Sequence, residues 1–379
     1  MVCLRKVQSI RLKPGFSLFL KIIGIVLCIL LGIFLFYRKE ISDLTKLGYS
    51  EKSSNIILFS YKKDYVLSIG ENKTLNKAFE SKYFNENYID NYTKIDYVNQ
   101  KDFIKNINKL IDKGYSNQDI NILFAHGTSE SISEFAKRDK VRYLEEFFSI
   151  DYAKLENYDR YVKHSDETGD DEEDTVLIVN LDLDKEDYTE VKTVDKFSFD
   201  MLVNKHRGLS EDFVPDNLVN IESKYASSND LQINKTVMNQ YIKMYRAALS
   251  EGYELIINSA YRSYSDQQEI SDLYLKTYGQ EYVDKYVAKP GFSEHQTGLA
   301  FDIGSKSVNV FLNSKEYTWM QENAYKYGFI MRFTPRNQDF TGFKSEPWHY
   351  RYVGEDIAKY IYEHKNMAFE EYYAMFLDI

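Results

Sequence analysis

The 379-residue chain has little cysteine, proline or glycine, and each shortage excludes a class of protein. Its only two cysteines are Cys3 and Cys28, so the rest of the chain can hold neither a disulfide framework nor a cysteine-ligated metal. Five prolines and 17 glycines exclude a collagen-like or Pro/Gly-rich disordered chain, and 44% apolar residues are enough to bury a core. Basic residues are outnumbered by acidic ones, 48 against 58, which argues against nucleic acid as a partner. The composition therefore predicts a folded protein of about two domains plus appendages.

One long apolar run, residues 16–37, is broken only by Ser17 and Lys21, and it matches the roughly 20 residues of a membrane-spanning helix. A cleaved signal peptide is the alternative, but its apolar region is only about 7 to 15 residues long and ends in small residues. More basic residues precede the run than follow it, which predicts a cytoplasmic tail at 1–15 and an extracellular body. Residues 1–39 carry seven basic and no acidic side chains, so the formal net charge of −10 leaves −17 on the remainder. We expect a single-pass anchor in the cell membrane and a strongly acidic exported part.

Residues 38–200 are expected to form an extracellular stalk and a mainly helical module. Apolar residues recur at helical spacing over 101–162, whereas 55–67 is rich in β-branched and aromatic residues and predicts two short strands. The acidic run at 166–174 lacks the ligand order of a calcium loop and predicts a solvated loop, and 175–181 predicts a strand. The module is interpreted as a spacer that packs on the next domain, with binding of a partner or of the cell wall as the alternative.

The last part of the chain, from about residue 201, carries the residues that could act in catalysis or bind a metal. Residues 237–249 place their apolar side chains on one face of a helix, and a short strand follows at 255–257. The next helix is expected to start at Ser265, with Gln268 three residues later as its capping-box partner.

Two further segments predict strands that each present a polar side chain. In the strand 299–303 the apolar residues share one face, so Asp302 points away from them. A proline disfavours a helix through 346–349, and a strand in the segment 346–353 places His349 opposite its aromatic neighbours.

Two imidazoles and one carboxylate are a complete protein ligand set for a catalytic zinc ion, which keeps its fourth position for water. His295, Asp302 and His349 supply such a set. Glu346 could take a proton from the attacking water and pass it to the leaving amine, and the permanent charge of Arg262 could hold an oxyanion or a substrate carboxylate. Taken singly, each residue also has a structural explanation, so spacing alone leaves metal binding open.

Three ordered motifs resemble those of the VanY-type D-alanyl-D-alanine carboxypeptidases of the M15 zinc peptidases. They are Ser259-Ala-Tyr-Arg-Ser263, Ser293-Glu-His-Gln-Thr-Gly-Leu-Ala300 with Asp302, and Glu346-Pro-Trp-His-Tyr-Arg-Tyr-Val-Gly354. The resemblance is strong over about 201–379. It implies an α+β domain of the M15 zinc peptidase fold, with a small antiparallel sheet flanked by helices, preceded by the membrane helix and the helical module.

The resemblance also implies roles for single residues. By it, His295, Asp302 and His349 bind Zn²⁺ and Glu346 is the catalytic base, while three residues lie by the substrate: Arg262, Ser293 and Gln268. The implied activity is removal of the C-terminal D-alanine from peptidoglycan stem peptides. An L,D-carboxypeptidase that trims tetrapeptide stems is the alternative within the enzyme class, and a non-catalytic wall-binding protein with a vestigial zinc site is the alternative outside it.

Overall fold

The structure is a computed structural model that describes residues 14–60, 62–189, 191–306, 310–365 and 367–378. The chain divides into two compact units between Glu145 and Glu146. The expected cytoplasmic tail lies almost entirely outside the described residues.

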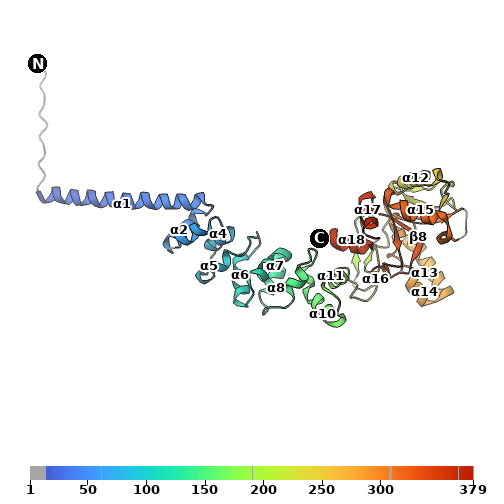
Figure 1. Ribbon diagram of the computed structural model, residues 1–379, viewed down its shortest axis with the longest axis horizontal. Coiled ribbons are helices and arrows are strands. Elements are labelled where there is room, and N and C mark those ends of the chain that lie inside the picture. The colour runs from blue at the N-terminus through green and yellow to red at the C-terminus, as the bar shows by residue number, and fades with distance from the viewer. Residues whose placement is uncertain (1–13, 61, 190, 307–309, 366, 379) are drawn as a thin grey trace, which may run out of the picture. The chain divides into compact units, whose positions relative to one another are not determined.

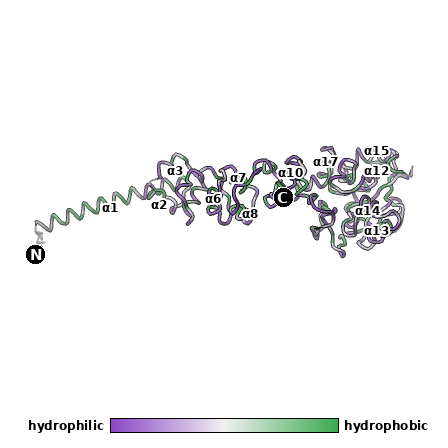
Figure 2. Tube along the Cα trace, turned by 90° about the horizontal axis from the view of Figure 1, so that it is seen from below, coloured by the Kyte–Doolittle hydropathy of each residue, from purple (hydrophilic) through white to green (hydrophobic). Residues whose placement is uncertain are grey.

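The first unit begins with the long helix α1, Pro14–Lys46. Within it, Leu18–Lys46 is long and apolar enough to cross a membrane by length and composition, with a mean hydropathy of 2.9 in its most apolar window. Its large apolar side chains are exposed from Leu18 to Phe36, and the hydrophobic colour follows most of the helix in Figure 2. The apolar run expected at 16–37 is therefore part of a single helix, and toward its end Tyr37 contacts a neighbouring side chain, that of Phe59.

Short helices make up the rest of the first unit (Figure 1). They are α2 (Glu51–Phe59), α3 (Lys63–Ile69), α4 (Lys73–Glu80), α5 (Ile89–Tyr92), α6 (Phe103–Asp112), α7 (Asn117–His126) and α8 (Ser129–Phe135), and α9 (Leu144–Phe148) spans the division between the units. The two strands predicted over 55–67 are wrong, because the segment forms the end of α2 and most of α3. The Ser50 side chain accepts the backbone N–H of Ser53 at 3.1 Å and so starts α2, and a short apolar run alone does not distinguish a helix from a strand.

The second unit is built around a four-stranded antiparallel sheet in the order β5-β6-β8-β7. The strands are β5 (Leu255–Ser259), β6 (Ala300–Ser305), β7 (Phe329–Phe333) and β8 (Glu346–Tyr352). Two further pairs are short: β1 (Lys192–Thr193) with β2 (Arg207–Gly208), and β3 (Leu218–Asn220) with β4 (Gln232–Asn234). The α+β class and the small antiparallel sheet are thus confirmed.

Helices complete the second unit, and some of them flank this sheet (Figure 1). They are α10 (Tyr158–Thr168), α11 (Glu172–Asn180), α12 (Lys235–Ser250), α13 (Tyr264–Tyr278), α14 (Gln280–Tyr286), α15 (Lys315–Asn323), α16 (Gln338–Thr341), α17 (Glu355–Glu363) and α18 (Phe369–Phe376). The strand predicted at 175–181 is wrong, because α11 occupies it. Asp171 accepts the N–H of Asp174 at 2.9 Å and starts α11, so the acidic run at 166–174 joins two helix ends instead of forming an extended loop.

The sheet separates an apolar core from a polar face. Leu299, Phe301 and Ile303 are each at most 1% exposed and belong to the core under α12. Phe301 contacts Tyr350 of the adjacent strand, and its register partner is also Tyr350. The same antiparallel register sets Asp302 directly opposite His349 on the other face. Pairing of β6 with β8 therefore assembles the polar face.

The unit that carries the sheet starts at Glu146, so residues 146–200 are part of it. Leu177 of α11 and Leu181 share a buried cluster with Phe369 and Ala374 of α18. This packing groups the segment before residue 201 with the domain expected over 201–379.

Candidate metal centre

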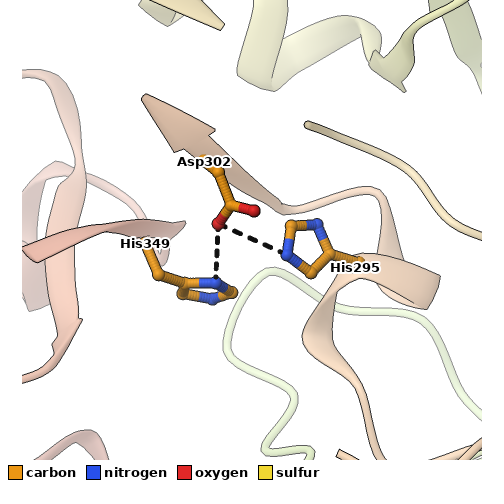
Figure 3. Close-up of side chains that lie close together, drawn as sticks. All are labelled: His295, Asp302 and His349. Carbon is orange, nitrogen blue, oxygen red and sulfur yellow. Dashed lines mark ion pairs between the residues drawn. The ribbon is translucent and has the colours of Figure 1, made fainter. Parts of the chain in front are cut away.

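Three separate elements bring His295, Asp302 and His349 together (Figure 3). His295 lies in the short 3₁₀ helix η3, Glu294–Thr297, while Asp302 is on β6 and His349 on β8. Asp302 Oδ1 is 3.5 Å from His295 Nε2 and 3.2 Å from His349 Nδ1. The three candidate ligand atoms lie within 4.8 Å of one another.

Gly298 makes the turn from η3 into β6. Its φ of +67° is left-handed, and a Cβ there would lie 3.0 Å from a Leu218 methyl carbon. Glycine therefore allows His295 to fold back over the strand that carries Asp302.

Hydrogen bonds on the far side of each imidazole orient its ring. His295 Nδ1 lies 2.7 Å from the carbonyl oxygen of Ala260, to which its N–H donates. His349 Nε2 lies 3.3 Å from Glu294 Oε2 and donates to that carboxylate. In its neutral form, each ring therefore turns an unprotonated nitrogen toward Asp302. Metal-binding histidines typically donate their other N–H to a carbonyl or carboxylate oxygen in this way.

This arrangement fits a cation. With both imidazole protons engaged elsewhere, two nitrogen lone pairs and a carboxylate oxygen face one another, and the buried Asp302 Oδ1 has no hydrogen-bond partner among the described residues. Burial lowers the pKa of His295 and favours its neutral form. Burial alone would raise the pKa of Asp302, but the two histidines hold it well below its usual range. The donor set, two imidazoles and one carboxylate, is one that a catalytic zinc ion takes.

In the absence of a metal, a proton can take its place. Burial opposes charge on His349, but the adjacent carboxylates of Asp302 and Glu294 raise the pKa of this imidazole to about 9. The same carboxylates that stabilise an imidazolium would stabilise a metal cation.

A cluster of buried charged side chains lies on the side of His349 that faces away from Asp302. Glu294 Oε1 accepts Arg332 Nε–H at 2.8 Å and an Arg351 N–H at 3.1 Å. Arg332 also donates to both carboxylate oxygens of Glu370, at 2.9 and 2.5 Å. The sequence patterns did not predict a supporting role for any of these four residues. Glu294 and Arg351 lie inside the quoted motifs next to ligands and could have been found there, whereas nothing local marks Arg332 or Glu370.

Glu346 opens β8 beside the three donors. Its Oε2 is 3.9 Å from His349 Nδ1, close to the candidate ligand atoms but outside their group of three. Burial, reinforced by the charge of Asp302, raises the pKa of Glu346 to about 7, although His349 and Arg262 act in the opposite direction. A carboxyl group that titrates near neutral pH is suited to proton transfer.

Arg262 and Ser293 line the same cavity as the three donors, which has a volume of about 380 Å³. Arg262 donates to Gln267 Oε1 at 2.6 Å and to Ser259 Oγ at 3.1 Å. Ser293 Oγ accepts the N–H of His295 at 3.3 Å and so starts η3. Aromatic side chains form much of the cavity wall: Tyr274, Tyr282, Phe292, Phe333, Phe343 and Trp348.

Gln268 is not brought to this cavity. It is exposed on α13 and donates to Asp272 Oδ1 at 2.8 Å. The capping box predicted from Ser265 and Gln268 is wrong, because Ser263 caps the helix with Asp266 as its partner.

The preceding residue of α13, also a glutamine, lines the cavity instead. Each residue turns an α-helix by about 100°, so neighbouring side chains face different ways. Gln267 is 1% exposed, lines the cavity and donates to the carbonyl oxygen of Ala288 at 2.7 Å. Gln267 therefore stands where Gln268 was expected.

One cavity thus holds a His–Asp–His donor set, an arginine and a carboxyl group whose pKa is near 7. This combination is typical of the active site of a metal-dependent hydrolase. Comparison with known proteins agrees. Residues 230–355 match the family model described as VanY, D-alanyl-D-alanine carboxypeptidase. The chain is 33% identical over 180 residues to VanXYC of Enterococcus gallinarum, named a bifunctional D-Ala-D-Ala dipeptidase and carboxypeptidase, covering 45% of this chain and 92% of the relative. The chain belongs to the VanY family.

Two further relatives each match part of the chain. YodJ of Bacillus subtilis (strain 168), provisionally named a carboxypeptidase, is 41% identical over 180 residues, which are 45% of this chain and 66% of YodJ. A D-alanyl-D-alanine carboxypeptidase of Enterococcus faecalis (strain ATCC 700802 / V583) is 38% identical over 154 residues, 38% of this chain and 57% of that relative. The chain thus spans less than two thirds of the length of these two relatives. Among solved structures, the LdcB LD-carboxypeptidase is 37% identical, with a TM-score of 0.45, covering 50% of this chain and 92% of that one.

Proposed function

We propose that the protein is a zinc-dependent D-alanyl-D-alanine carboxypeptidase that removes the C-terminal D-alanine from peptidoglycan stem peptides. The observation that carries this proposal is the convergence of His295, Asp302 and His349 on one cavity with Glu346 beside them. Members of the family with this name in two Enterococcus species support the choice of substrate.

Zinc in this site would supply a Lewis acid that lowers the pKa of water and polarises the scissile carbonyl. The protein's own groups then move the proton and hold the substrate. Glu346 takes the proton as the water oxygen bonds to the carbonyl carbon, and returns it to the nitrogen as the peptide C–N bond breaks. The products are free D-alanine and a stem peptide shorter by one residue.

Arg262 supplies the positive charge in the cavity. Its guanidinium is held by Gln267 and Ser259, so it presents a fixed charge to the negative oxygen that develops or to the terminal carboxylate of the substrate. Ser293 lies beside His295 and contacts the same substrate end. In this proposal Gln267 takes the binding role expected of Gln268.

We further propose that α1 is the anchor of an extracellular enzyme, with the N-terminus in the cytoplasm. The support is the apolar length of Leu18–Lys46, together with the excess of basic residues before the span. Residues 38–145 would then act as a spacer between the membrane and the catalytic unit. An anchored enzyme at the outer surface would meet new stem peptides where they are inserted.

The test is incubation of the detergent-solubilised full chain with pentapeptide and tetrapeptide stems, with and without a chelator, read by mass spectrometry. We expect loss of one D-alanine from the pentapeptide, abolished by the chelator. Loss from the tetrapeptide alone would instead identify an L,D-carboxypeptidase. Zinc binding without hydrolysis of either stem would identify a wall-binding protein with a vestigial site.

A further inference from the structure

A line of buried charges runs from the C-terminal helix α18 to the candidate ligand His349. Glu370 of α18, Arg332 of β7 and Glu294 of η3 follow one another along it, and each is at most 3% exposed. Glu370 lies beyond residues 230–355, the part of the chain that matches the family model.

The steps from Glu370 to Arg332 and from Arg332 to Glu294 are short charge-assisted hydrogen bonds, whereas the last step, from His349 to Glu294, is longer at 3.3 Å. The Arg332 guanidinium donates through two nitrogens to Glu370 and through its third to Glu294. Arg332 therefore uses all three nitrogens to bridge two carboxylates, a geometry that only a planar fork of donors provides. Glu294 then accepts from His349 Nε2 through its other oxygen.

The charges of the cluster balance only when Glu370 is present. Arg332 and Arg351 carry two positive charges, and Glu294 and Glu370 carry two negative ones. Glu294 already accepts from both guanidinium groups and from His349, so without Glu370 its single carboxylate would be the only one of the cluster left to balance both arginine charges. Its negative charge would then be drawn toward the arginines and away from His349.

We infer that Glu370 is a positioning residue for the metal centre, acting through Arg332 and Glu294 on His349. It compensates the Arg332 charge, so that Glu294 remains available to fix the ring of His349 and to raise its basicity toward a metal. The inference rests on the proposed zinc site. A purely structural alternative is that the Glu370 carboxylate only ties α18 to β7.

The test is the zinc dissociation constant of the folded full chain in detergent, measured by competition with a chelating indicator. Loss of an outer-shell partner of a metal-binding histidine typically costs 10–100-fold in metal affinity, so we expect Glu370→Gln to weaken zinc binding by about tenfold or more. Glu371→Gln is the matched control, because it makes the same chemical change at the next position of α18. The Glu371 carboxylate accepts the N–H of Ala368 and no bond of the cluster, so this control should stay within about twofold of wild type.

A double variant separates positioning from general loss of stability. If Glu370 acts through Glu294, then Glu370→Gln added to Glu294→Gln should weaken zinc binding little further. A lower melting temperature of Glu370→Gln with an unchanged zinc dissociation constant would overturn the inference. If that variant does not fold, Arg332→Lys serves instead, since one ammonium cannot bridge both carboxylates, and wild-type zinc affinity there would equally overturn it. Failure of the wild-type chain to bind zinc at all would overturn the proposed function together with this inference.

Discussion

Replacement of Glu346 by glutamine is the sharpest test of the proposed mechanism. The substitution keeps the size of the side chain and removes its ability to take a proton. General acid–base catalysis typically contributes 10²–10⁴-fold, so the turnover of a pentapeptide stem should fall by about that factor. This corresponds to about 2.7–5.5 kcal/mol in the activation barrier.

The same variant should keep its zinc. Glu346 Oε2 is 3.9 Å from His349 Nδ1, and Glu346 is not one of the three converging donors. Zinc content should therefore stay at the wild-type ratio by elemental analysis while D-alanine release falls. Full activity would refute the assignment of the base, and loss of zinc would show that Glu346 is itself a ligand.

The pH profile gives a second readout of this variant. A base acts in its deprotonated form, so the wild-type kcat/KM should rise with pH through the pKa of Glu346. That pKa is raised to about 7 in the metal-free protein, and the positive charge of bound zinc would lower it, so the acid limb should lie at or below pH 7. The residual activity of Glu346→Gln should lack this limb, and an unchanged limb would assign it to another group.

Further predictions concern the metal and the core. His295→Ala should lose both zinc and activity, whereas His164→Ala should lose neither, because His164 pairs with Asp170 away from the cavity; zinc retained in the first variant would refute the ligand set. Since the pKa of His349 is raised to about 9, zinc must displace the proton of this imidazole at neutral pH. Calorimetry at pH 7 in buffers of different ionisation enthalpy should therefore detect the release of about one proton per zinc ion bound. Zinc binding without proton release would contradict this prediction. Phe301→Ala should lower the free energy of unfolding by about 3–5 kcal/mol, because the ring is fully buried between the sheet and α12; a loss below about 1 kcal/mol in a denaturant titration would contradict that packing.

The candidate metal centre was predictable in part, because its residues carry local patterns and lie in motifs that resemble those of a family, although spacing alone left metal binding open. The alternation of apolar residues over 299–303 already turned Asp302 away from the core, and the strand at 346–352 placed His349 on a polar face. In the structure, the register between β6 and β8 sets Asp302 opposite His349. The sequence alone could not supply that register, because it depends on pairing between segments about 50 residues apart.

Other features of the chain lacked a local signal or gave a misleading one. The apolar run at 175–181 has strand-like composition, but Asp171 caps it as a helix that packs on α18. Gln267 lines the cavity where the resemblance implied Gln268, because neighbouring side chains on α13 point in different directions. Arg332 and Glu370 acquire their roles only through tertiary contacts, which no spacing in the sequence reveals.

The central claim is that one zinc ion held by His295, Asp302 and His349 carries out D-alanine release. The most direct measurement determines zinc per chain and D-alanine release from a pentapeptide stem on the same preparation, before chelation, after chelation and after zinc is restored. We predict one zinc per chain, with release lost and regained in proportion to it. D-alanine release that persists in the zinc-free protein would contradict the claim.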